Sequence, residues 1–284
     1  MALSLASIST TERIRAGKSA IPSILEISGM DVAKFGPYEF DGSLPTIASP
    51  SGGATQDAEA RTAIDLIITA LGARPGGVGQ FQTAINGTSA VAATVAAGSA
   101  SGKLRLDPGT DNDGYSGLSL GRHLTGSRNA HCWWHITTPS TLASWKFEAG
   151  FTDVVAGTDA GAVNVKATPS FRADDAVVII YDTAANTTLS LVGVAATVVP
   201  TPVHFDWTIV AATEYYVGIE LRGSSARGYL LDANARLLDS TTWLTDAVTS
   251  TVLLTPWLFD QNRSASQRLL DTDMLFAYQR RSVA

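Results

Sequence analysis

The sequence predicts a mainly β protein, with a C-terminal antiparallel β-sandwich of the jelly-roll type preceded by an extended arm and one short helix. Three observations lead to this prediction. From about residue 111 onward, apolar and polar residues alternate with a period of two, which is typical of strands. Turn-forming clusters such as 157–159 and 223–226 separate these strands. Upstream, one segment has the period of a helix.

The chain divides into four regions by composition and periodicity. In chain order, these are an extended arm (1–50), a short oligomerising helix (51–75), a Gly/Ala/Ser-rich linker with short strands (76–110) and the β-sandwich domain (111–284).

The arm contains scattered Pro and Gly and has no sustained hydrophobic period. Such a segment buries little surface by itself, so we expect a neighbouring molecule to hold it. A short strand is expected near residues 24–27. The apolar arm residues expected to make the contact are Ile24, Leu25, Ile27 and Phe35.

The helix is predicted from apolar residues three and four positions apart, with Thr55 as N-cap and Gly72 after the last turn. So short a helix is marginally stable alone, and its apolar stripe must pack against the sandwich or against copies of itself. The spacing favours copies, and we expect a homotrimer. The residues expected to mediate self-association are Ile64, Ile67, Ile68 and Leu71.

Several sandwich strands can be read from alternation. Segments 145–151 and 214–222 each place aromatic and aliphatic residues on one face, and 204–210 is expected to place Phe205, Trp207 and Ile209 together. The continuous apolar run 176–182 suits a strand buried on both faces. Segment 269–281 is expected to complete a sheet late in the chain.

Residues 131–137, HCWWHIT, hold two of the four histidines and the single cysteine. On a strand, Cys132, Trp134 and Ile136 would face the core, and the face with His131, Trp133 and His135 would point to water, a ligand or a partner. The two histidines would lie roughly 13 Å apart, too far to bind one zinc ion together. We therefore interpret this second set as an outward ligand or interface face, with a metal site as the less favoured alternative.

Composition excludes some classes of protein. The net charge of −6 and the lack of a Lys/Arg run argue against nucleic acid as a partner. The stretches 75–102 and 183–205 have no charged residue, but their polar and proline residues argue against insertion into a membrane. The N-terminus does not resemble a secretory signal.

Catalytic and metal motifs are weak. GLSLG matches the nucleophile motif around Ser119, but no helical period follows it. Asp111 and Asp113 resemble part of a calcium loop; a turn is favoured, and a bound calcium ion is left open. Glu148 and Lys146 are interpreted as a surface ion pair. No cofactor is expected.

The segment from GYSGLSLG to VVIIYD, which includes WKFEAGFTD, resembles the concanavalin-like jelly rolls of bacteriophage structural proteins, and the resemblance covers about 111 to the C-terminus. It implies a decoration, head-fibre or tail-fibre protein. Glucanases of this fold family carry a Glu-x-Asp-x-x-Glu strand, whereas here Ala-Gly-Phe follows Glu148.

We therefore predict a non-enzymatic virion structural protein, assembled in the host cytoplasm, whose N-terminal region attaches to capsid or tail subunits and whose jelly roll is displayed; capsid decoration or a head fibre is favoured. The alternative is a tail-fibre receptor-binding or carbohydrate-binding module that contacts a host surface glycan. A glycan-cleaving enzyme is the third reading and the least favoured, since it needs two carboxylates in one cleft.

Overall fold

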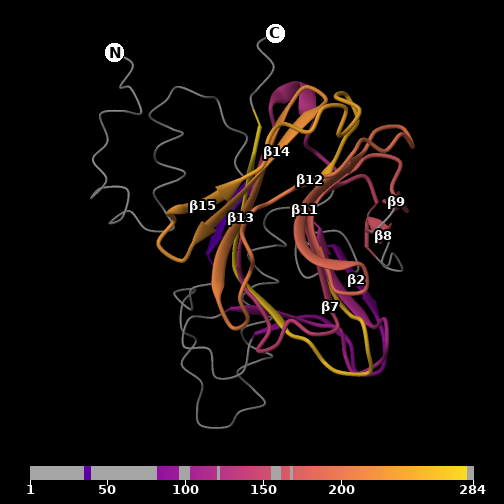
Figure 1. The fold of residues 1–284 in the computed structure, drawn as a ribbon, viewed down its shortest axis with the longest axis vertical. Helices are drawn as coiled ribbons and strands as arrows, with labels where there is room; N and C mark the ends of the chain where they lie inside the picture. The colour runs from indigo at the N-terminus through magenta and orange to yellow at the C-terminus, as the bar shows by residue number, and fades with distance from the viewer. Residues whose placement is uncertain are drawn as a thin grey trace, which may run out of the picture.

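The computed structural model describes residues 35–39, 82–95, 103–119, 122–154, 161–166 and 169–279. They form two large antiparallel sheets packed face to face and a small two-stranded sheet (Figure 1). The predicted mainly β fold with an antiparallel sandwich is confirmed.

The eight-stranded sheet contains the strand that carries HCWWHIT. From edge to edge it runs through β15 (Leu237–Ser240), β14 (Ser225–Asp232), β13 (Glu214–Arg222), β6 (His131–Thr137), β17 (Leu270–Tyr278), β4 (Leu104–Asp107) and β3 (Val91–Val95), and β1 (Phe35–Glu39) also pairs with β17.

The seven-stranded sheet faces it. From edge to edge it runs through β12 (Val203–His204), β11 (Asn186–Val194), β10 (Ala176–Asp182), β7 (Trp145–Thr152), β16 (Thr255–Asn262), β5 (Tyr115–Ser119) and β2 (Gln82–Asn86). The small sheet pairs β8 (Val163–Val165) with β9 (Ser170–Phe171). A 3-10 turn, η3 (Gly126–Arg128), lies between β5 and β6.

The main core fills the space between the two large sheets. It includes Trp134 of β6, Trp145 and Phe147 of β7, Ile179 of β10 and Ile219 of β13, all of them fully buried. Truncating one of the large members to alanine would cost about 3–5 kcal/mol, because a cavity would remain. The alternation predicted for β6, β7 and β13 is therefore confirmed.

A second core lies on the other face of the seven-stranded sheet. Val178 and Ile180 of β10, with Trp257 and Phe259 of β16, pack there against Val163 of β8. Figure 1 shows β8 and β9 on the side of this sheet away from β13, β14 and β15. The chain thus covers this face with its own segment, and β10 is buried on both faces as predicted.

Residues 76–110 do more than link two regions. β2 pairs with β5 in one sheet, and β4 pairs with β17 in the other. The sandwich therefore includes strands upstream of residue 111, the boundary that the sequence suggested.

At residues 204–210 the structure differs from the predicted strand. β12 ends at His204, and Phe205 and Ile209 are buried while Trp207 is 40% exposed. The backbone amides of Asp206 and Trp207 both donate to Oδ2 of Asp239, at 2.7 and 3.0 Å, so they are not available for a strand ladder. This contact turns the indole outward.

The predicted helix and its self-association residues Ile64, Ile67, Ile68 and Leu71 lie outside the described residues, as do Ile24, Leu25 and Ile27 of the arm. Phe35 begins β1, which pairs with β17 of the same chain. Its predicted contact with a neighbouring molecule stays a prediction. Within the described ranges, no helix has the length and apolar character needed to cross a membrane.

Candidate functional site

His131, Trp133 and His135 of β6 share one face of the eight-stranded sheet, as the alternation predicts, but His135 is buried at 4% exposure. Each ring contacts a tyrosine of the same sheet: the two histidines stack on tyrosines of the flanking strands β17 and β13, and Trp133 makes a tilted contact with a tyrosine of β14. The ring centroids are 4.4 Å apart for His131 and Tyr278, 5.6 Å for Trp133 and Tyr229, and 4.2 Å for His135 and Tyr216.

Trp133 also lies flat over Gly218 of β13, where an added Cβ would sit 2.2 Å from the indole ring. The aromatic side chains on this face therefore pack mostly against other residues of the same chain. No group of three or more His, Cys, Asp or Glu side chains in the described ranges is placed to hold a metal ion.

The candidate calcium ligands have partners within the chain. Oδ2 of Asp111 accepts the backbone amide of Thr88 at 2.6 Å, and Oδ1 of Asp113 accepts Nη1 of Arg263 at 3.2 Å. The two carboxylates thus serve different contacts in the turn. Ser119 is buried at the end of β5, between β16 and β2, so it is not the exposed nucleophile of a strand–turn–helix motif.

Lys146 and Glu148 correct the sequence analysis, which interpreted them as a surface pair. They share a face of β7 and are 2.7 Å apart, but both are fully buried. The reason is the segment around β8, which covers them and which alternation within β7 could not reveal.

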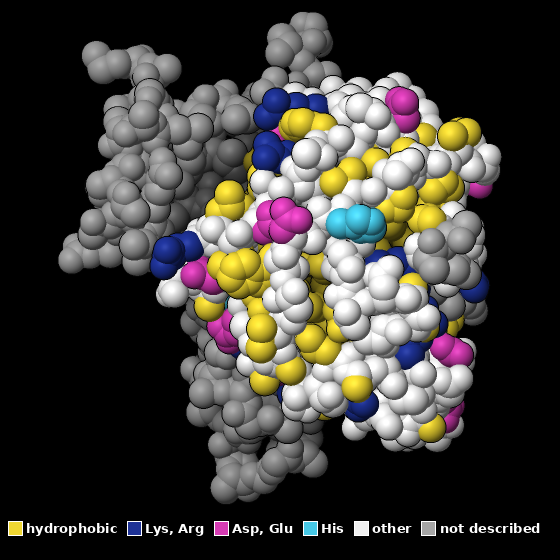
Figure 2. Space-filling view, in the orientation of Figure 1, with side chains coloured by type: hydrophobic (Ala, Val, Ile, Leu, Met, Phe, Trp, Pro, Cys, Tyr) yellow, Lys and Arg dark blue, Asp and Glu magenta, His cyan; other side chains and the backbone are white. Residues whose placement is uncertain are grey.

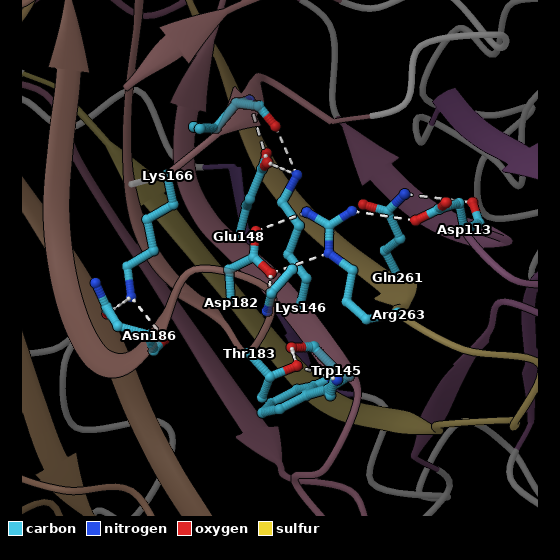
Figure 3. A network of polar contacts seen from close by, with 12 residues as sticks. Asp113, Trp145, Lys146, Glu148, Lys166, Asp182, Thr183, Asn186, Gln261 and Arg263 are labelled. Atoms are coloured by element: carbon cyan, nitrogen blue, oxygen red, sulfur yellow. Dashed lines mark hydrogen bonds and ion pairs between the residues drawn. The ribbon is translucent and has the colours of Figure 1, made fainter. Parts of the chain in front are cut away.

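Glu148 holds that covering segment. Its carboxylate accepts the backbone amides of Ala162 and Val163 at 2.7 and 3.1 Å and the indole N–H of Trp257 at 3.0 Å. Lys146 donates to the carbonyl of Val163 at 2.6 Å. Both backbone groups of Val163 are therefore bound by β7 side chains, as a neighbouring strand would bind them. Figure 3 shows the two side chains, Lys146 and Glu148, next to one another.

Gly161 is required for this arrangement. Its φ is +86°, and an added Cβ would lie 2.7 Å from Oε1 of Glu148. Only glycine fits both the left-handed backbone and the close approach of the carboxylate.

Two further cations tie loops to the same face, as Figure 3 shows. Arg263 makes a bidentate pair with Asp182, at 2.9 and 2.6 Å, and reaches Asp113. Lys166 donates to the side-chain oxygen of Asn186 at 2.7 Å, and burial lowers the pKa of Lys166 to about 8. These contacts use the polar groups over the seven-stranded sheet for structure.

An open groove lies at the edge of the sandwich, between residues 207–213, the start of β13 and the β14–β15 hairpin. Its volume is about 510 Å³. We call it the Trp207 groove; its lining includes Trp207, Val210, Tyr215, Asp232, Asn234 and Leu238. Figure 2 shows hydrophobic and acidic side chains next to one another on the face that carries β12, β13 and β15.

The groove has an aromatic wall and a polar wall. Trp207 is fixed through its backbone by Asp239, and Val210 beside it is 56% exposed. The hydroxyl of Tyr215 accepts the amide of Val210 at 3.0 Å, which shapes the floor.

On the polar wall, Oδ1 of Asp232 accepts the backbone amides of Asn234 and Arg236, each at 2.9 Å. The turn thus orients the Asp232 carboxylate at the groove.

Sequence reasoning missed this site because three distant segments build it. Alternation predicts Trp207 on the same strand face as Phe205 and Ile209. The Asp-Ala-Asn run at 232–234 was a local signal for a turn, but nothing near it in the sequence indicated an aromatic partner.

No protein-family model matches the sequence, and no curated protein matches it. The fold is similar to that of a protein of unknown function from Shewanella oneidensis MR-1, with 14% identity, coverage of 74% of this chain and 82% of that chain, and a TM-score of 0.50. Peanut lectin is 10% identical, with coverage of 74% and 96% and a TM-score of 0.49.

An alginate lyase of polysaccharide lyase family 7 is also 10% identical, with coverage of 66% and 82% and a TM-score of 0.43. This finding corrects the expectation of a non-enzymatic protein, because the sandwich is a fold that enzymes also use. At such identities the likeness concerns the fold alone. In fold, the described part of the chain is an antiparallel β-sandwich.

Proposed function

We propose that the sandwich is a carbohydrate-binding domain and that its ligand lies in the Trp207 groove. The observation that carries this proposal is the half-exposed indole of Trp207, held at the wall of an open groove by the contact between its backbone and Asp239. Exposure of 40% of a large apolar side chain to water is unfavourable in free energy. The apolar face of a sugar ring could stack on the indole and remove this surface from water.

The remainder of the groove supports the same proposal. Its volume of about 510 Å³ falls within the range of roughly 300–1,000 Å³ that is usual for small-molecule sites. Asp232 and Asn234 also line the groove and offer hydrogen-bonding groups, which a bound sugar needs for its hydroxyls.

The outer face of the seven-stranded sheet is a less accessible place for a ligand than the Trp207 groove. There the segment around β8 occupies the space over Lys146, Glu148 and Trp257. A ligand could reach that face only after the segment had moved, whereas the Trp207 groove is open as it stands.

The predicted virion role remains a proposal of a different kind. It rests on the arm and the helix, nearly all of which lie outside the described residues. Within that proposal, the groove would bind a glycan of the host surface while the N-terminal region attached to capsid or tail subunits.

The test is titration of the full chain with a panel of neutral, amino and acidic oligosaccharides, monitored by tryptophan fluorescence and calorimetry. We expect binding by at least one oligosaccharide, and we expect Trp207→Ala to weaken it at least about tenfold, because the stacking surface is removed. Trp243→Ala is the matched control, since Trp243 packs under Arg222 at 4.8 Å and does not line the groove.

Absence of binding across the panel would refute the proposal. It would equally be refuted by affinities that Trp207→Ala leaves unchanged, since the ligand would then lie elsewhere on the molecule.

A further inference from the structure

The charged groups of the Trp207 groove are acidic. Glu214 and Asp232 line it, and within the described part of the chain no Lys, Arg or His does. Arg236 of the same hairpin is exposed but does not line the groove. The electrostatic character of the site therefore depends on whether each carboxylate is already neutralised.

Glu214 is largely neutralised within the chain. Its Oε1 forms an ion pair with Lys103, and its Oε2 lies 3.8 Å from Nε2 of His135. It adds little net charge to the groove.

Asp232 has no such cation. Its Oδ1 accepts two backbone amides, and these orient the carboxylate without cancelling its charge. No ion pair joins it to another described residue, and its Oδ2 takes no hydrogen bond from the described residues. Asp232 thus presents an oriented acceptor, with a negative charge, in the groove that Trp207 also lines.

The neighbourhood adds negative potential. Asp239 binds the backbone of residues 206 and 207 immediately behind the indole, and the Asp206 side chain is exposed beside it. A uronate or sulfated sugar would meet like charge here, whereas a cation would be favoured both by the carboxylate and by the face of the indole.

We infer that the Trp207 groove selects an amino sugar, a glycan whose rings carry a protonated primary amine such as glucosamine; this inference rests on the proposed carbohydrate-binding function. The apolar face of the sugar ring stacks on Trp207, and the ammonium group donates to Oδ2 of Asp232. Neutral sugars bind through stacking and hydroxyl contacts alone, and acidic sugars are disfavoured.

Four oligomers of equal length test the inference, at a pH where the amine is protonated: glucosamine, N-acetylglucosamine, glucose and a uronic acid. We expect the glucosamine oligomer to bind the full chain about tenfold more tightly than the two neutral oligomers, because an ammonium–carboxylate hydrogen bond is stronger than a neutral one. The uronic acid oligomer should bind most weakly.

The variant Asp232→Asn should bring the affinity for glucosamine down to that for glucose and leave the neutral oligomers nearly unchanged. Asparagine retains Oδ1 as acceptor for the two backbone amides, so the turn should persist. Asp174→Asn is the control, because it makes the same change of charge on the exposed β9–β10 connection and should keep the preference.

Each other outcome has a definite meaning. Equal affinity for glucose and glucosamine oligomers, both lost in Trp207→Ala, would overturn the amine inference and leave the carbohydrate-binding proposal standing. A glucosamine preference that survives Asp232→Asn would also overturn it, since the net charge of −6 would then be the cause. If no oligomer bound, both proposals would fail.

Discussion

Asp260 is a carboxyl group inside the main core, on β16. Its Oδ1 accepts the indole N–H of Trp145 at 2.6 Å, and its Oδ2 has no partner in the described structure. Complete burial raises the pKa of Asp260 well above its ordinary value of 3.8, and the hydrogen bond from Trp145 offsets only part of that rise. The folded chain therefore keeps a proton that the unfolded chain releases.

This protonation makes stability depend on pH. Above about pH 4 the unfolded state is ionised at this position while the folded state is not, so stability falls as pH rises toward the folded-state pKa. Asp260→Asn removes the titration and keeps the acceptor for Trp145. We expect the variant to lose this slope and to gain stability relative to the parent as pH rises from 4 to 7.

Urea denaturation at a series of pH values would measure the slope in each chain. Parallel curves for parent and variant across this range would show that Asp260 is already ionised in the folded chain.

Trp207 illustrates what alternation misses at single residues. The pattern at 204–210 predicts Phe205, Trp207 and Ile209 on one face, but only Phe205 and Ile209 are buried. The contact that turns the indole outward comes from Asp239, a residue in another strand, and no local pattern reports such a contact.

At the scale of elements, β7 shows both the reach and the limit of sequence patterns. Alternation identified the face of Trp145, Phe147 and Phe151 as core. It also placed Lys146 and Glu148 together on the opposite face, which is correct, but it assigned that face to solvent. A strand face that carries two charged residues is usually exposed to solvent. Here both residues are buried because the segment around Val163 covers them.

The buried pair predicts unequal costs for its two members. In Glu148→Gln, the Lys146 ammonium stays buried without an anion, and we expect a loss of about 3–5 kcal/mol in the free energy of unfolding. In Lys146→Met, the carboxylate keeps three N–H donors from Ala162, Val163 and Trp257, so the loss should be smaller.

Chemical denaturation of both variants checks this order. A larger loss for Lys146→Met than for Glu148→Gln would mean that the contact between Lys146 and the Val163 carbonyl, rather than the charge pair, holds the segment.

The order of strands in the whole molecule gives central positions to late segments. β16 lies between β7 and β5 in one sheet, and β17 lies between β6 and β4 in the other. The sequence predicted a late strand at 269–281 from its apolar pattern. It could not predict the central place of that strand, because pairing partners such as Trp134 and Leu275 are far apart in the chain.

A truncation tests this organisation. A chain ending before Leu270 lacks the strand that joins β6 to β4, so we expect it to lose cooperative thermal unfolding and to expose core side chains such as Trp134. A chain ending at Gln279 keeps all of β17 and should unfold cooperatively. Circular dichroism and dye binding would separate the two cases, and a cooperative transition in the shorter chain would contradict the central role of β17.

The central position of β17 also bears on biosynthesis. At translation speeds of about 5–20 residues per second, β6 leaves the ribosome on the order of ten seconds before the strand that must lie beside it. During that interval the nascent polypeptide exposes the apolar surface of an incomplete sheet. Newly made chains should therefore depend on chaperones until β17 has been synthesised.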